Sequence, residues 1–243
     1  YEALLPAFTA SFSASAVASL LGIHKENLTI HISESLTPFL LVRLITLGII
    51  FGITGGLFAW CLKRTKKYLG EKIKNPLVRV FSIGVVLSIL FLVLYRGRYC
   101  GFGTNLVEAV FTGEKVYAYD WALKFILTVL TLSAGFQGGE VTPLFTIGAT
   151  LGAVLGSLFG IPVELSAALG YAAVFGGGTN TLLAAIFIGG EIFGYDYLPY
   201  FFIVCTAAYV FNRNSSIYSR QKLTKYSCLL YTSPSPRDRT RSR

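Results

Sequence analysis

Residues 135–156 read GFQGGEVTPLFTIGATLGAVLG and form the most informative segment of the chain. Its Gly138–Gly139 pair permits a tight backbone turn, and Pro143 suits the first turn of a helix. These residues predict a helix that begins near Thr142, inside an apolar region. Further along, glycine recurs at every fourth position, which places it on one face of the helix and lets another helix approach closely: Gly148, Gly152, Gly156 and Gly160.

The start of this helix is a candidate anion site. Its first backbone N–H groups have no partner within the helix and carry the positive end of the helix dipole. The alternative is an ordinary re-entrant turn in which Glu140 and Thr142 act as N-caps, and the sequence leaves both readings open. Intramembrane carboxylates are usually functional. Because Glu140 would tolerate an anion when protonated and repel it when ionised, it is a candidate for proton coupling.

The composition predicts an all-α, polytopic integral membrane protein. Hydrophobic residues make up 53% of the 243 residues and charged residues 14%, against about 25% charge in an ordinary soluble domain. This excludes a disordered protein and a disulfide-stapled secreted module. At roughly 20 residues per span, the chain has room for about six to eight helices, counting short or broken ones.

The two parts of the chain differ in pattern. Before Asp120 we expect spans at 3–22, 39–62 and 77–95, loops at 23–38 and 63–76, and a loop with a short helix at 96–119. After Asp120 the apolar segments are short and interrupted by glycine, which predicts broken and tilted helices of the kind that bind ions in secondary transporters. These segments are 121–134, 143–160, 163–175, 179–194 and 197–211.

The distribution of charge predicts the topology and argues against nucleic-acid binding. The net charge is +9, but residues 219–243 hold seven basic residues and one acidic one, and the remaining 14 basic and 11 acidic residues leave only +3. The 63–76 loop is rich in Lys and Arg, so we expect it to be cytoplasmic and the 23–38 loop to be external. The scattered cysteines and the two histidines, His24 and His31, predict no metal site, and no organic cofactor is implied.

The residues GGEVTPLF, followed by IGATLG, resemble the anion-binding helix start of the CLC superfamily of chloride channels and proton-coupled antiporters. The general family form is a Gly-Gly pair, an apolar residue, Phe, a small residue and Pro. Glu140, Val141 and Thr142 stand at the three variable positions and resemble the fluoride/proton antiporter branch, often called CLC-F. The resemblance implies that the Thr142 hydroxyl helps to coordinate fluoride and that Glu140 belongs to the proton pathway.

Two later stretches also resemble this family. In NSSIYSRQ, residues 214–221, Tyr218 fits the Tyr that points its hydroxyl into the central anion site; taken alone, the sequence favours an interfacial Tyr, and the GGEVTPLF stretch shifts the balance to the anion site. Residues 170–194 resemble a region in which a short break precedes a helix that ends in an acid. Here we expect the break at Gly176–Gly178 with Asn180 as a cap, and we expect Glu191 to be structural.

The resemblance covers residues 1–221, as the second inverted half of a CLC-type transmembrane domain, and residues 222–243 are expected to be a disordered or artefactual tail. The Gly-Arg-Glu-Gly-like segment of the first half, whose Glu gates the pathway, is not found, so we expect a C-terminal fragment. The predicted protein is part of a fluoride/proton antiporter in a bacterial-type plasma membrane. Its expected partners are fluoride or chloride, protons, membrane lipid and a second subunit of a homodimer, which 179–190 and 197–211 would face.

Three alternatives are weighed against this reading. A chloride channel or chloride/proton antiporter of the CLC superfamily is the nearest, and an apolar residue and Phe at positions 140 and 141 would favour it. An intramembrane protease would need HExxH, a membrane Ser with His, or an Asp pair, and none of these occurs in the apolar segments. A membrane scaffold would be preferred if Glu140, Thr142 and Tyr218 faced lipid or packed core.

Overall fold

The computed structural model describes residues 4–22, 28, 30, 37–94, 97–212, 215–218 and 221. Within these residues the secondary structure is entirely helical, so the predicted all-α class is confirmed. The helices are α1 (Leu4–Leu20), α2 (Pro38–Lys72), α3 (Pro76–Val93), α4 (Thr104–Phe111), α5 (Asp120–Ala134), α6 (Val141–Phe159), α7 (Val163–Thr179), α8 (Leu182–Phe193), the 3₁₀ helix η2 (Tyr195–Tyr197) and α9 (Leu198–Phe211).

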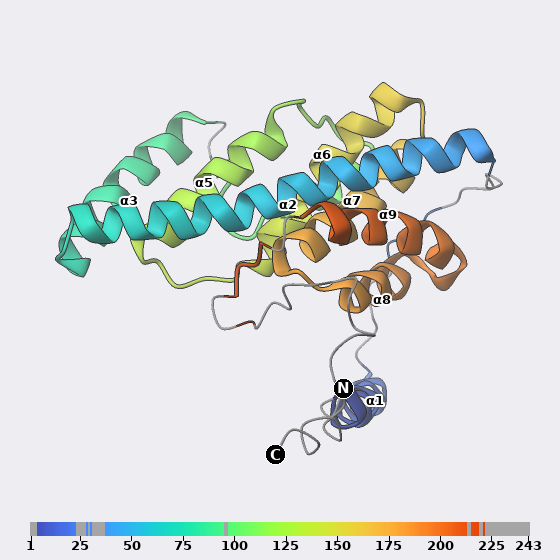
Figure 1. The fold of residues 1–243 in the computed structure, drawn as a ribbon. Helices are drawn as coiled ribbons and strands as arrows, with labels where there is room; N and C mark the ends of the chain where they lie inside the picture. The colour runs from blue at the N-terminus through green and yellow to red at the C-terminus, as the bar shows by residue number, and fades with distance from the viewer. Residues whose placement is uncertain are drawn as a thin grey trace, which may run out of the picture.

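Helix α2 runs along the whole body of the molecule and packs mainly against α5, α7 and α9 (Figure 1). Its N-terminus is capped by the Thr37 side chain, which accepts a hydrogen bond from the Leu40 backbone N–H. The predicted loop at 63–76 is wrong for most of its length, because α2 continues to Lys72 and only Ile73–Asn75 separate it from α3. Lys, Arg and Glu are good helix formers, so the basic residues extend the helix.

Glycine faces set two close helix contacts. A methyl group at Gly48 would lie 2.6 Å from the Ala207 side chain, so α2 packs here directly on α9. A methyl group at Gly148 would overlap the carbonyl oxygen of Gly170, which brings α6 and α7 into backbone contact. The close approach predicted for the glycine face of α6 is confirmed, except that Gly160 lies beyond α6 and ends it in the left-handed region with φ 64°.

The predicted break at Gly176–Gly178 is displaced. These glycines are the last full turn of α7, and the helix ends instead at Asn180, whose φ of 55° is left-handed. The glycines stay helical because their lack of side chains lets α7 lie against α2: a methyl group at Gly55 would be 2.5 Å from the Gly178 nitrogen. Asn180 therefore ends α7, and Thr181 stands at the N-cap of α8.

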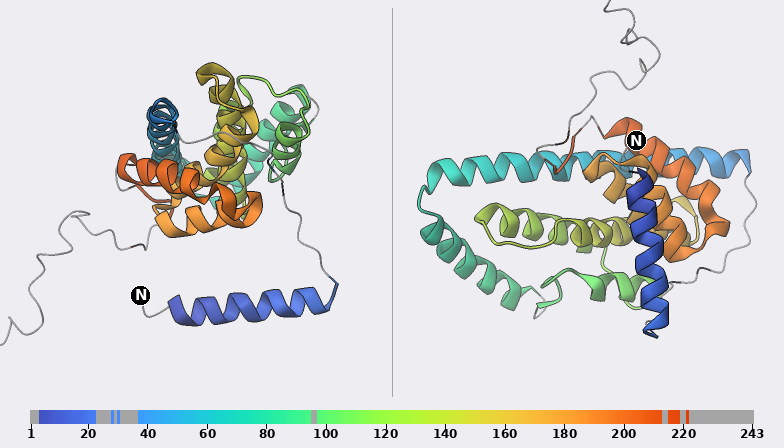
Figure 2. Two further views of the ribbon diagram at one scale, coloured as in Figure 1. Left: turned by 90° about the vertical axis from the view of Figure 1, so that its right-hand side faces the viewer. Right: turned by 90° about the horizontal axis from the view of Figure 1, so that it is seen from below.

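Three described helices, α2, α3 and α6, are long and apolar enough to cross a membrane. Helix α3 exposes most of its apolar side chains, with Phe81 at 75% and Leu92 at 74%. Helix α1 lies apart from the helical body in Figure 1 and in the left view of Figure 2, and it is exposed along its length. Apart from α6, the helices of the second part of the chain, including α5, α7 and α9, are shorter than a full span, as the glycine-interrupted segments predict.

Candidate functional site

The turn between α5 and α6 carries the predicted anion site. Helix α5 ends at Ala134, and Gly135 takes a left-handed conformation with φ 111°. Glu140 occupies the N-cap position of α6 with φ −87° and ψ −22°, and no side chain among the described residues caps the helix. The capping alternative is therefore not realised. Glu140 lies half-buried at a helix start whose N–H groups remain available for a ligand.

The next two predicted residues belong to the first turn of α6. Val141 and Thr142 are half-buried, and Pro143 behind them is fully buried. No hydrogen bond joins the Thr142 hydroxyl to a described residue, while its backbone carbonyl oxygen lies 3.2 Å from the Thr146 hydroxyl. The structure thus places Glu140, Val141 and Thr142 side by side at one helix end, each of them partly buried.

A second loop, which contains residues 101–103, packs next to this turn. The Thr146 hydroxyl lies 3.1 Å from the carbonyl oxygen of Phe102 and 3.3 Å from that of Gly103. A Cβ atom at Gly139 would be 3.4 Å from the Phe102 ring. Residues 101–103 therefore pack against both the glycine turn and the second turn of α6.

Tyr218 follows a segment that is tied to the end of α7. The Ile217 backbone N–H donates to the carbonyl oxygen of Gly178 over 2.9 Å, and the Ser216 hydroxyl donates to that of Thr179 over 3.1 Å. Gly178 in turn faces Leu144 in the first turn of α6, since a Cβ there would be 2.9 Å from a Leu144 methyl carbon.

This arrangement brings the Tyr218 backbone toward the start of α6, but its side chain does not complete a site. The Tyr218 side chain is 47% exposed. Within the described part of the chain, its hydroxyl makes no hydrogen bond to Glu140 or Thr142. The convergence of the three side chains therefore stays a prediction.

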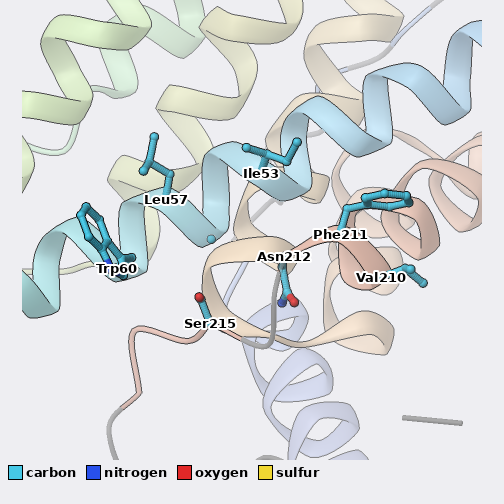
Figure 3. Close-up of a pocket in the computed structure, with 8 residues that line it drawn as sticks. Ile53, Leu57, Trp60, Val210, Phe211, Asn212 and Ser215 are labelled. Carbon is cyan, nitrogen blue, oxygen red and sulfur yellow. The ribbon is translucent and has the colours of Figure 1, made fainter. Parts of the chain in front are cut away.

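A separate groove of about 540 Å³ lies between α2 and the end of α9 (Figure 3). Its walls are mostly apolar, and Asn212 is held there by a 2.7 Å hydrogen bond to the Asn180 side chain. Glu140, Thr142 and Tyr218 do not line it. Its lining residues are Ile53, Gly56, Leu57, Trp60, Val210, Phe211, Asn212 and Ser215.

The sequence matches the family described as voltage gated chloride channel over residues 1–213. The chain belongs to this family. Over 229 residues it is 32% identical to a chloride/fluoride channel protein of Pseudomonas syringae pv. tomato, a match that covers 92% of this chain and 50% of the relative. It is also similar to the crystal structure of a CLC-type fluoride/proton antiporter, with a TM-score of 0.89 and 52% identity over 92% of this chain and 56% of that one.

The chain therefore spans about half the length of these two relatives. Its membership makes it an integral membrane protein of a transporter and channel family. The resemblance deduced from the GGEVTPLF stretch is confirmed, and so is the CLC-type fold. The predicted roles of individual residues are not decided by these matches.

One polar cluster beside the site escaped prediction. Lys124 is buried on α5 and donates to the carbonyl oxygens of Tyr99 and Gly101 at 3.0 and 2.7 Å. One turn earlier, the buried Asp120 pairs with Arg98 at 2.9 Å. The sequence signal for this cluster was a pair of charges, Asp120 and Lys124, four residues apart in an otherwise apolar segment. This spacing places both on one helix face, and charges within apolar membrane segments are costly.

Proposed function

We propose that this chain forms part of a fluoride/proton antiporter that exports fluoride from the cell. The observation that supports this most directly is the uncapped start of α6, where Glu140 and Thr142 are half-buried at free helix N–H groups. The similarity to a CLC-type fluoride/proton antiporter at 52% identity supports the same conclusion. The proposed anion-binding residues are Glu140, Val141, Thr142 and Tyr218.

The chemistry of fluoride fits such a site. Fluoride is small and strongly hydrated, so it gives up water only to strong hydrogen-bond donors. In the proposed site the backbone N–H groups of the first turn of α6 supply donors together with the positive end of the helix dipole. The Thr142 and Tyr218 hydroxyls each add one donor. Gly138, Gly139 and Pro143 shape the turn that presents these groups.

Glu140 supplies the proton-linked step in this proposal. Ionised, its carboxylate repels an anion at the start of α6; protonated, the same side chain is neutral and can donate a hydrogen bond. Binding of a proton and occupancy by fluoride thus favour each other at this position. For exchange, the two ions must reach the site from opposite sides of the membrane: fluoride enters from the cytoplasm and leaves to the outside, while the proton reaches Glu140 from the outside and is released to the cytoplasm.

Transport in proteoliposomes tests this function. Residues 1–221 would replace the matching segment of the fluoride/proton antiporter that is 52% identical, and the chimera would be reconstituted with sodium fluoride inside. We expect fluoride efflux that is accelerated by an inward proton gradient and acidifies the vesicle interior. Fluoride movement that is indifferent to the proton gradient would overturn the antiport mechanism.

Chloride transport is the second candidate, because the Pseudomonas relative is named for both chloride and fluoride. The same vesicles loaded with potassium chloride separate the two. We expect chloride efflux to stay at the level of protein-free vesicles. Chloride carried as fast as fluoride would replace the fluoride antiporter by a general CLC anion channel or exchanger.

We further propose that the protein works as a homodimer in a bacterial plasma membrane. Helices α8 and α9 expose large apolar side chains, as a subunit interface in lipid requires: Leu183, Phe187, Phe202, Val210 and Phe211. Replacement of Phe187 and Phe202 by Trp should shift the chimera from dimer to monomer in mild detergent. An unchanged dimer would place the interface elsewhere.

A further inference from the structure

Lys124 occupies an unusual position for a charged residue. Its side chain is 2% exposed on α5, and its ammonium donates to the backbone carbonyl oxygens of Tyr99 and Gly101. Within the described part of the chain, no carboxylate pairs with it. A buried ammonium that bonds only to carbonyl oxygens fixes the backbone that carries them, because leaving those bonds unmade would strand a buried charge.

The backbone that Lys124 holds is the loop behind the start of α6. A Cβ at Gly103 would lie 2.8 Å from the Lys124 side chain and 2.9 Å from the Thr146 hydroxyl, so α5, the loop and α6 meet there. The φ of 87° at Gly103 also requires glycine for the close approach. Lys124 on α5 and Thr146 on α6 therefore both form hydrogen bonds to the same loop.

The loop also contacts the glycine turn that precedes α6. The Phe102 ring stands beside Gly139, one residue before Glu140. The Phe102 carbonyl oxygen is held at the same time by Thr146. Movement of residues 101–103 would thus release both the Gly138–Gly139 turn and the second turn of α6.

Asp120 holds the other end of the loop, at Arg98 and Tyr99. Its carboxylate accepts a 2.6 Å hydrogen bond from the Tyr99 hydroxyl and pairs with Arg98. The charge of Asp120 is therefore matched by a cation of the loop itself. The charge of Lys124 is matched only by carbonyl dipoles that lie next to the site.

We propose that Lys124 is a positioning residue, which sets the geometry of the Gly138–Glu140 turn by clamping residues 99–103 against α6. This inference rests on the proposed function for its consequence in transport, but the clamp itself is a property of the fold. Lys124 acts through the loop and does not touch the anion.

Hydrogen exchange of the purified 243-residue chain in detergent tests the clamp without any transport. In Lys124→Met, which keeps the shape and removes the donors, the amides of 99–103 and 136–140 should exchange about tenfold faster, as the loss of one to two hydrogen bonds implies. Thr146→Val should release the same segments from the other side. Val129→Ala, a buried change elsewhere on α5, is the matched control and should leave them unchanged.

Transport by the chimera tests the consequence. Lys124→Met should raise the fluoride KM about tenfold while the maximal rate changes less than threefold, and Lys124→Arg should restore part of the affinity. Val129→Ala should leave KM unchanged even if it lowers thermal stability. Unchanged exchange in both Lys124→Met and Thr146→Val would overturn the clamp. Increased exchange with no fluoride transport by the parent chimera would retain the clamp and refute the proposed function instead.

Discussion

The backbone N–H of Ile217 donates a 2.9 Å hydrogen bond to the carbonyl oxygen of Gly178. This bond joins the residue before Tyr218 to the last turn of α7, and Gly178 lies against Leu144 of α6. The segments around Leu144 and Tyr218, about 75 residues apart in sequence, therefore both lie against the C-terminal end of α7. The packing of α7 between them, rather than local sequence, determines the site.

The contact between α6 and α7 should tolerate no side chain at Gly148. A methyl group there would overlap the Gly170 backbone, and neither backbone can rotate away as a side chain can. We expect Gly148→Ala to destabilise the protein by about 3 kcal/mol, at the upper end for overpacking. Thermal unfolding in detergent measures this. Gly70→Ala, where a methyl group would meet only the flexible Arg79 side chain at 3.5 Å, is the control and should be neutral or slightly stabilising.

Thr142→Val should weaken fluoride binding. The substitution keeps the shape of the side chain and removes its hydroxyl. The loss of one hydrogen bond to an anion is worth about 1 to 2 kcal/mol, which corresponds to a roughly five- to thirtyfold higher fluoride KM. Initial efflux rates of the chimera at several fluoride concentrations give this value. An unchanged KM would remove Thr142 from the anion site.

Glu140→Gln should chiefly abolish proton coupling. Glutamine retains the size and hydrogen-bonding capacity of the side chain but cannot titrate. We expect fluoride efflux to lose its dependence on the pH gradient, measured with a pH-sensitive dye inside the vesicles. Glu164→Gln, an exposed acid in the first turn of α7, should behave as wild type. Proton-coupled efflux at the wild-type rate in Glu140→Gln would contradict the assignment.

The sequence predicted the features that depend on local pattern. The Gly138–Gly139 pair with Pro143 located the start of α6, and the glycine spacing on α6 located its close contact with another helix. The predicted loop was wrong at 63–72, because helix propensity continues α2 through a run of charged residues. The predicted break was wrong at Gly176–Gly178, because packing against α2 keeps these glycines helical. The sequence could not reveal the Lys124 clamp, because the carbonyl oxygens that satisfy a buried ammonium leave no trace in side-chain identity.

The basic end of α2 should be cytoplasmic. Thirty-five residues of helix extend about 52 Å, well beyond the hydrocarbon thickness of about 30 Å, so the segment that carries Lys63–Lys72 projects from the membrane. A cysteine at Lys66, introduced after removal of the native cysteines, should react with an impermeant maleimide only in inside-out vesicles. A cysteine at Lys25 should react only in intact cells. Labelling of position 66 from outside would invert the topology.

Tyr218→Phe tests whether the two distant segments act on one ion. The structure ties the Tyr218 backbone to α7 beside the start of α6, while the ring is half-exposed and its hydroxyl contacts neither Glu140 nor Thr142. If fluoride draws the hydroxyl into its coordination shell, Tyr218→Phe should raise the fluoride KM by a factor similar to that of Thr142→Val, because each removes one donor.

The double variant that combines Thr142→Val with Tyr218→Phe provides the decisive measurement. Two donors to the same ion should show non-additive effects, since residues that share a partner couple by about 0.5 kcal/mol or more. Tyr195→Phe, an exposed tyrosine in η2, is the matched control and should leave KM unchanged. Strictly additive effects would place Tyr218 away from the ion that Thr142 binds. An unchanged KM in Tyr218→Phe would remove this tyrosine from the anion site.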